Sequence, residues 1–156
     1  MIRRAEPRDA ADLQTICEAA LGHAAPVSLL ERRIRELTAD SGCFLAVYED
    51  EETQRALGFL HAQTYRLLYG GSGWNVIALA VAPEAQRQGI GRKLLSALER
   101  DAVRRGDAFV RLNCNVTREG AHAFYRQMGY ACDKVQKRFI RSLREEVESR
   151  CPGRPG

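Results

Sequence analysis

The chain has 156 residues and a mass of 17.5 kDa, a size that indicates one ordinary domain and excludes a multi-domain machine. Hydrophobic residues make up 45% and charged residues 28%, a balance typical of a folded protein and not of a disordered tail. The net charge of +4 is mild and the arginines are scattered, so we expect no nucleic-acid partner, and anionic small ligands fit at least as well.

Five cysteines without a CxxC pair and three widely separated histidines predict neither a disulfide framework nor a metal site. The first residues, MIRRAEPRDA, lack the apolar region of a secretory signal. No stretch approaches the roughly 18 apolar residues that a membrane helix needs. We therefore expect a cytoplasmic protein without a membrane partner.

Two amphipathic helices follow a short strand at residues 2–4. Apolar residues recur at three- and four-residue spacing over 10–20, with Gly22 as the stop, and again over 27–37, with a stop at 41–42. Helices with one apolar face are expected to cover a sheet.

The pattern then changes to that of β-strands. Residues 43–48 and 56–65 are β-rich runs separated by a polar, acidic stretch, which predicts a hairpin with a solvated tip over 49–54. Residues 74–81 are apolar on both faces, as a fully buried central strand should be, and Pro83 ends that strand.

The second half of the chain begins with a glycine loop that leads into a helix ending at Arg105. An alternating strand over 109–116 follows, and then a fourth helix that stops at Gly129. We expect the chain to close with a hairpin over 130–133 and 136–143.

These elements predict one domain over residues 1–143. The remaining residues, 144–156, are charged and then rich in proline and glycine, and we expect them to form a disordered tail.

The loop over residues 83–92 is the most informative segment. Main-chain amides in such a loop and in the first helical turn have no partner within the helix, and the helix dipole adds partial positive charge. Its two glycines let phosphate oxygens approach the main chain, and Arg87, Arg92 and Lys93 add charge. We expect a diphosphate group here.

Two common phosphate loops do not match this segment. Walker A requires GxxxxGK[ST], but Lys93 stands one place late and Leu94 replaces the hydroxyl residue. The dinucleotide fingerprint GxGxxG would also need glycine where Leu94 stands.

A strand ending V-x-P followed by Q/R-x-x-G-x-G/A closely resembles the acetyl-coenzyme-A loop of the GNAT superfamily of N-acetyltransferases. Here it reads Val81-Ala82-Pro83, then Gln86-Arg87-Gln88-Gly89-Ile90-Gly91. A second block similar to the family's L-x-V-x-x-x-N-x-x-A-x-x-x-Y-x-x-x-G-F/Y follows at the expected distance, with Leu112, Cys114, Arg118, Ala121, Tyr125, Gly129 and Tyr130. The order of elements is similar to that family across nearly the whole chain.

This resemblance implies a mixed α/β (α+β) fold, with a mostly antiparallel sheet of six or seven strands, splayed at the central strands and flanked by about four helices. It implies transfer of acetyl from acetyl-CoA to a primary amine by direct attack in a ternary complex. Tyr125 would protonate the leaving thiolate. The implied cofactor-binding residues are Leu79, Ala80, Val81, Gln86, Arg87, Gln88, Gly89, Ile90, Gly91, Arg92, Asn113 and Arg118.

Several points stay open at this stage. Arg118 stands where the family usually has asparagine, and an arginine there could instead reach a phosphate. Ile77 and Ala78 occupy positions that are often acidic, so the general base is His61, His122, or water or the backbone. Trp74 belongs either to the core or to an acceptor pocket.

The acceptor amine is also open, and either a small molecule or a peptide fits. A homodimer is possible. The alternative function is an inactive acyl-CoA-binding sensor or partner-binding domain, which the missing acid favours and Tyr125 opposes. Cys114 is expected to be a small buried strand residue and not a nucleophile.

Overall fold

The computed structural model describes residues 1–143, so the predicted tail over 144–156 lies outside the described residues. The chain divides into two compact units, one over Met1–Arg118 and a second that begins at Glu119. The first unit contains β1 (Ile2–Arg4), η1 (Pro7–Asp9), α1 (Ala10–Leu21), α2 (Val27–Ala39), β2 (Cys43–Glu49), β3 (Ala56–Arg66), β4 (Ser72–Val81), η2 (Pro83–Ala85), α3 (Ile90–Arg105) and β5 (Phe109–Leu112). The second unit contains α4 (Glu119–Gln127).

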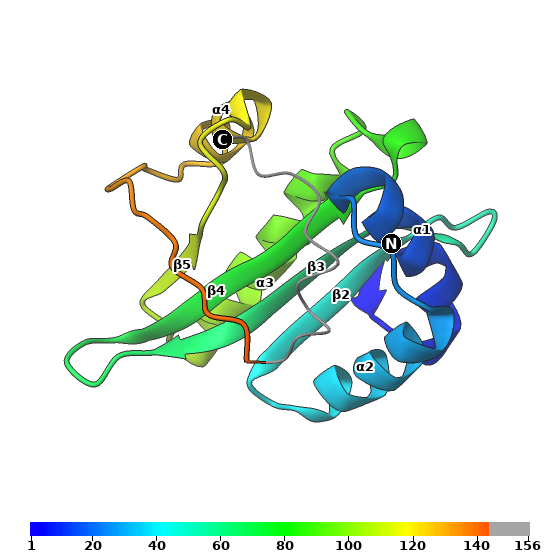
Figure 1. The fold of residues 1–156 in the computed structure, drawn as a ribbon, viewed down its shortest axis with the longest axis horizontal. Helices are drawn as coiled ribbons and strands as arrows, with labels where there is room; N and C mark the ends of the chain where they lie inside the picture. The colour runs from blue at the N-terminus through cyan, green and yellow to red at the C-terminus, as the bar shows by residue number, and fades with distance from the viewer. Residues whose placement is uncertain (144–156) are drawn as a thin grey trace. The chain divides into compact units, whose positions relative to one another are not determined.

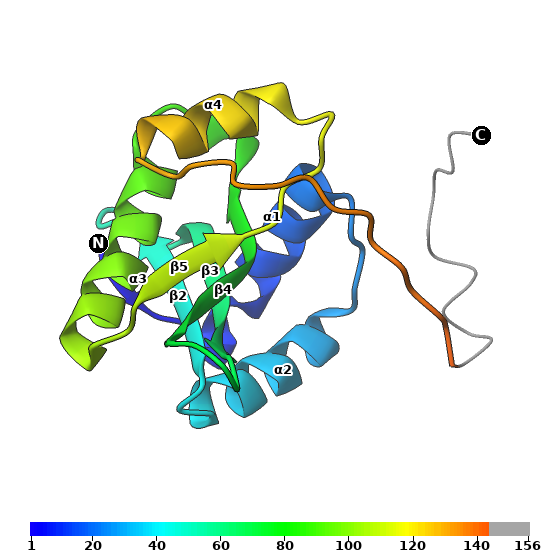
Figure 2. The same cartoon turned by 90° about the vertical axis from the view of Figure 1, so that its left-hand side faces the viewer.

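The first unit is a five-stranded sheet in the order β1-β2-β3-β4-β5 (Figure 1). Neighbouring strands run antiparallel from β1 to β4, whereas β4 and β5 run parallel. Helices α1 and α2 cover one face of the sheet and α3 covers the other (Figure 2). The predicted mixed α/β fold with four helices is therefore confirmed.

The predicted count of six or seven strands is wrong, because the described residues form five. No strand follows β5 within residues 1–143, and the hairpin expected over 130–143 is absent there. A strand is stable only when its apolar side chains pack and its backbone is paired. Here the large apolar residues of that segment are each at least three-quarters exposed: Val135, Phe139, Ile140 and Leu143.

Helix α3 buries the apolar face that its spacing predicts. Its buried apolar residues are Ile90, Leu94, Leu95, Leu98 and Ala102, and the helix ends at Gly106 in the left-handed conformation, with φ 79°. Trp74 of β4 is fully buried and its indole Nε1 donates to Asp107 Oδ2 at 2.8 Å. Trp74 is thus a core residue, which decides between its two interpretations.

Strand β4 is not buried throughout, contrary to expectation, since Ile77 is 50% exposed. His61 of β3 lies opposite Ala78, but the next residue, Ala62, lies opposite Val76. Ile77 is therefore an extra residue, a β-bulge that bends the strand. Beyond the bulge β4 has no partner on its β5 side, because the β4–β5 pairing ends at Val76 and Leu112. β5 is correspondingly shorter than predicted.

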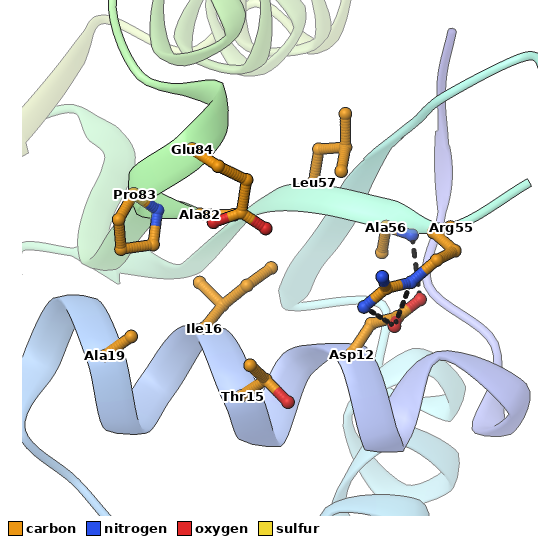
Figure 3. A pocket seen from close by; sticks show the side chains of 10 residues that line it. All are labelled: Asp12, Thr15, Ile16, Ala19, Arg55, Ala56, Leu57, Ala82, Pro83 and Glu84. Carbon is orange, nitrogen blue, oxygen red and sulfur yellow. Dashed lines mark hydrogen bonds and ion pairs between the residues drawn. The ribbon is translucent and has the colours of Figure 1, made fainter. Parts of the chain in front are cut away.

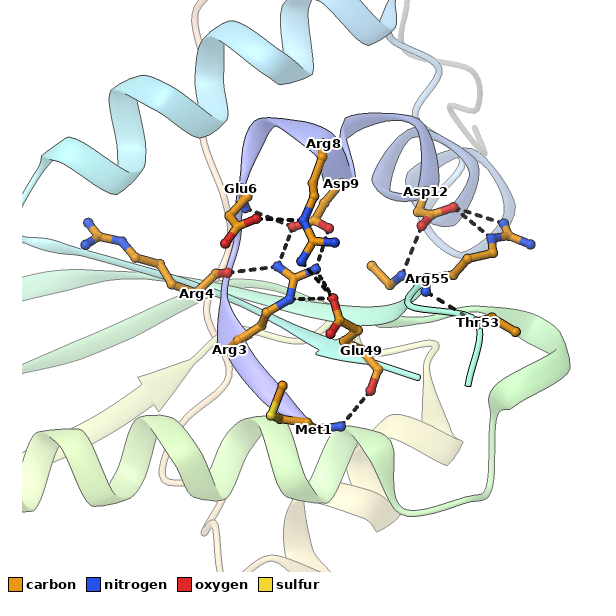
Figure 4. A network of polar contacts seen from close by, with 11 residues as sticks. Met1, Arg3, Arg4, Glu6, Arg8, Asp9, Asp12, Glu49, Thr53 and Arg55 are labelled. Carbon is orange, nitrogen blue, oxygen red and sulfur yellow. Dashed lines mark hydrogen bonds and ion pairs between the residues drawn. The ribbon is translucent and has the colours of Figure 1, made fainter. Parts of the chain in front are cut away.

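An ion-pair network ties the N-terminal strand to β2 (Figure 4). Arg3 binds both carboxylate oxygens of Asp9, at 2.7 and 2.8 Å, and its Nε donates to Glu49 at 2.6 Å. Arg8 reaches the same Glu49 oxygen at 3.0 Å. Glu49 is only 8% exposed, so the first residue of the acidic stretch belongs to this network and not to a solvated tip.

The network lowers the pKa values of both carboxylates. Burial raises the pKa of Asp9, but hydrogen bonds from Arg3 and from the Glu6 amide outweigh it, and the net pKa lies below the ordinary value. The hydrogen bond from Arg3 is the main cause that lowers the pKa of Glu49.

No described helix is both long and apolar enough to cross a bilayer.

Candidate active site

The loop between η2 and α3 presents main-chain amides without partners. Arg87 and Gly89 both adopt left-handed conformations, with φ 63° and 78°. The amide of Lys93 is the first in the helix to find a main-chain acceptor, the Gly89 carbonyl at 3.0 Å. Within the described part of the chain, the amides from Arg87 to Arg92 make no hydrogen bond. Successive free amides in such a turn form a concave site for an anion.

Gly89 leaves the space in front of these amides open. A Cβ built on Gly89 would meet no atom within 4 Å, and residues 86–89 are exposed. The positive φ is what favours glycine at this position, and the empty space permits a phosphate oxygen to reach the main chain. The positive end of the 16-residue helix α3 lies at the same point. The loop therefore offers a concave, positively polarised site for an anionic group such as a diphosphate.

The last residues of β4, which precede this loop in the chain, have an edge that β5 does not pair. The amide of Ala82 bonds to the Leu57 carbonyl of β3 at 2.8 Å, so by alternation the main-chain groups of Ala80 also point toward β3. Those of Leu79 and Val81 point the other way, to the side that β5 does not reach. Of the three β4 residues predicted to hold the cofactor, Leu79 and Val81 present main-chain groups there.

The side chains of the loop divide between two directions. Gln86 Nε2 donates to the Val81 carbonyl at 3.3 Å, whereas the side chains of Arg87 and Gln88 are exposed. Arg92 and Lys93 instead line a groove on the flank of α3, and the Lys93 ammonium lies 5.1 Å from the centre of the Tyr48 ring.

This groove beside α3 has a volume of about 410 Å³. It is lined by Met1, Ile2, Tyr48, Glu51, Arg92, Lys93, Ser96 and Arg100. None of its three basic side chains forms an ion pair with a described residue. The groove is therefore a second electropositive surface, contiguous with the first turn of α3.

A smaller hollow of about 110 Å³ lies between α1 and the residues that precede the loop (Figure 3). Asp12 lies at its wall, bound to Arg55 at 3.0 Å and to the Ala56 amide at 3.0 Å. The hollow is well below the roughly 300–1,000 Å³ of a ligand site, and the half-buried carboxylate of Asp12 is already bonded. We assign it a structural role.

The predicted residues after β5 lie on the last part of the first unit. Arg111 donates to Asn113 Oδ1 at 3.0 Å, and both Asn113 and Arg118 are exposed. Cys114 lies beyond the end of β5 and is half-buried, so it is not the buried strand residue that we expected.

Tyr125 lies on α4 in the second unit. Its ring makes edge contacts with Phe124, with 5.2 Å between ring centres, and with Tyr130, with 6.1 Å. His122, one helical turn earlier, is half-buried. The stop predicted at Gly129 is present as a left-handed residue, with φ 92°.

Three buried side-chain atoms of the first unit accept no hydrogen bond from a described residue: Nε2 of His61 on β3, Oδ1 of Asn75 on β4 and Oδ2 of Asp101 on α3. Asp101 Oδ2 lies 2.8 Å from Arg105 in an ion pair, so the atoms of His61 and Asn75 are the two without any partner in the described part of the chain. His61 was a candidate from its residue type, whereas Asn75 was missed. The only signal for Asn75 was a polar residue inside an otherwise apolar strand.

A family model described as the acetyltransferase (GNAT) family matches residues 10–130. The chain belongs to the GNAT family. It is accordingly an acyltransferase, and the family's donor is acetyl-CoA.

Solved structures share the fold of this GNAT protein. A transcriptional regulator from Bacillus halodurans C-125 is 23% identical, with a TM-score of 0.78 over 90% of this chain and 98% of that one. An aminoglycoside acetyltransferase from an uncultured soil metagenomic sample, in complex with trehalose, is 22% identical. Its TM-score is 0.76, over 92% of this chain and 96% of that one. Glucosamine-6-phosphate N-acetyltransferase from Arabidopsis thaliana is 18% identical. Its TM-score is 0.74, over 90% of this chain and 97% of that one.

Proposed function

We propose that the chain transfers acetyl from acetyl-CoA to a primary amine by direct attack in a ternary complex. The observation that carries the proposal is the row of unpartnered amides from Arg87 to Arg92, at the positive end of α3 and beside the unpaired side of β4. Acetyl-CoA supplies an activated thioester. The residues of this chain hold its diphosphate and orient the acetyl group.

The main-chain groups of Leu79 and the amide of Val81 have no strand partner on this side of β4, and they are suited to the rest of the donor. An extended pantetheine arm can pair with them as an added strand would. An amide on the same edge can donate to the thioester oxygen, on which negative charge develops as the amine attacks. Both roles require the gap that opens where the β4–β5 pairing ends.

Tyr125 is proposed as the acid that protonates the leaving thiolate. A phenol has an ordinary pKa of about 10 and a thiol one of about 8.5, so the transfer needs close contact between the two groups. The support for this role is the match of Tyr125 to the family's second motif.

Calorimetry with acetyl-CoA, followed by a thiol-release assay over a panel of primary amines, tests the proposal. We expect binding heat, and thiol release that depends on the amine. Binding without release from any amine would favour the inactive sensor instead. The absence of both binding and release would refute the proposed function.

A further inference from the structure

Register places four polar side chains together on one face of the sheet. Directly opposed residues of neighbouring strands share a face, so Gln63 of β3, Asn75 of β4 and Arg111 of β5 form a row across the sheet. His61 lies two residues before Gln63 and shares its face. We call His61, Gln63, Asn75 and Arg111 the β3–β5 polar face.

This polar face is opposite to the one that α3 covers. A Cβ at Gly58 would lie 3.0 Å from Ile90 of α3, so Gly58 points toward α3. His61 is three residues further along β3 and therefore points to the face on which α1 packs. Its register partner Ala78 is the chain neighbour of Leu79, so His61 lies one strand away from the proposed thioester position.

Asn75 Oδ1 is a hydrogen-bond acceptor, and His61 Nε2 is one when the ring proton is on Nδ1, so both atoms then need a donor. Asn75 Oδ1 always accepts, and a neutral histidine accepts through one ring nitrogen. Burial alone lowers the pKa of His61, and no charged group among the described residues contributes to that shift. His61 is thus neutral near pH 7, and a primary amino group offers the donors that these two atoms lack.

Arg111 gives the polar face a positive charge. Its guanidinium stacks 4.6 Å from the centre of the Tyr65 ring and donates to Asn113, but it forms no ion pair within residues 1–143. Tyr65 is held in turn by an edge contact with Phe109. The residues of β3, β4 and β5 that share this face include no carboxylate. A polycationic acceptor would therefore meet the charge of Arg111 and no compensating carboxylate on these strands.

We propose, on the basis of the acetyl-transfer function above, that the β3–β5 polar face binds an acceptor whose primary amino group lies at His61 and Asn75 and whose anionic group, a carboxylate or a phosphate, lies at Arg111. As the amine nitrogen bonds to the acetyl carbon and the carbon–sulfur bond breaks, the nitrogen's proton passes to His61 Nε2. The sulfur takes its proton from Tyr125. A guanidinium binds either anion through two parallel hydrogen bonds.

Matched pairs of amines test the proposal. Glucosamine 6-phosphate is compared with glucosamine, and alanine with alaninamide, in the thiol-release assay, with spermidine as the polycation. We expect the anionic member of at least one pair to have a kcat/KM about 10-fold or more above its partner. The pair that shows the preference identifies phosphate or carboxylate as the anion.

Arginine variants distinguish binding of the acceptor's anionic group at Arg111 from a general effect of the protein's positive charge. Arg111→Gln should reduce the preference for the anionic member to within about twofold, and Arg111→Lys should keep part of it. Arg105→Gln is the control, because Arg105 stacks on an aromatic ring in the same way, 5.0 Å from the Trp74 ring centre, but extends from α3 on the opposite face. It should leave the preference unchanged.

His61→Gln tests the proton transfer. It should lower kcat about 100-fold or more while changing KM for the anionic amine by less than about threefold. Asn75→Leu should instead raise KM.

Three results would overturn the proposal: a wild-type preference for neutral or polycationic amines, a preference that survives Arg111→Gln, or acetyl-CoA binding without acetylation of any anionic amine. If acetyl-CoA neither binds nor releases thiol, the proposed function itself fails, and that result is distinct from these three.

Discussion

Replacing Gly89 by alanine tests whether the loop before α3 binds the donor. Gly89 and Gly106 flank the same helix with nearly equal φ values of 78° and 79°, and a Cβ on either would meet no atom within 4 Å. The cost of alanine at each is therefore the left-handed conformation itself, about 1–2 kcal/mol. We expect Gly89→Ala and Gly106→Ala to lower the free energy of unfolding equally, as measured by urea denaturation.

Only Gly89→Ala should affect the donor. The new methyl group lies at the turn whose amides face the diphosphate, and loss of one hydrogen bond to a charged group costs about 1.5–3 kcal/mol. That corresponds to an increase of roughly 10- to 100-fold in the Kd of acetyl-CoA, measured by calorimetry. If both variants bind acetyl-CoA equally well, or both lose binding equally, this loop is not the diphosphate site.

Three further outcomes follow from the structure. Tyr125→Phe should lower turnover about 10²- to 10⁴-fold and leave the Kd of acetyl-CoA unchanged, whereas an unchanged turnover would exclude its acid role. The folded-state pKa values of Asp9 and Glu49 are lowered, so the stability that these carboxylates contribute is complete above about pH 5 and is lost as the pH falls through the folded-state pKa values. The Tm measured as a function of pH should therefore fall in acid, and it should fall less steeply in the Asp9→Asn variant. Trp74→Ala should cost about 3–5 kcal/mol in urea denaturation and Ile77→Ala less than about 1, and similar losses would contradict the burial of these two residues.

The sequence predicted best those features that depend on neighbouring residues. The apolar spacing from Ile90 to Ala102 was enough to predict the buried face of α3, because a helix repeats every 3.6 residues whatever it packs against. The turn before α3 was equally accessible, since all its residues are contiguous, whereas its binding of the donor stays a prediction. The hairpin expected over 130–143 was wrong because a strand depends on a partner elsewhere in the chain, which local alternation does not reveal.

The β3–β5 polar face could not be predicted for a related reason. Strict alternation along β4 would put Asn75 on the same face as Leu79, toward α3. The extra residue at Ile77 reverses the facing of everything before it, so Asn75 joins His61 on the other side of the sheet. Neither the bulge nor the strand register is encoded in a short motif.

The brief parallel pairing of β5 has a consequence for dynamics. Only Gly73 to Val76 join it to the sheet, and within residues 1–143 its outer edge is unpaired. β5 can therefore separate from β4 at the cost of few main-chain bonds, while the antiparallel ladder from β1 to β4 stays intact. Among the strands, hydrogen exchange should be fastest at the β5 amides and slowest in β3. A ligand bound between β4 and β5 would widen the sheet without unfolding it.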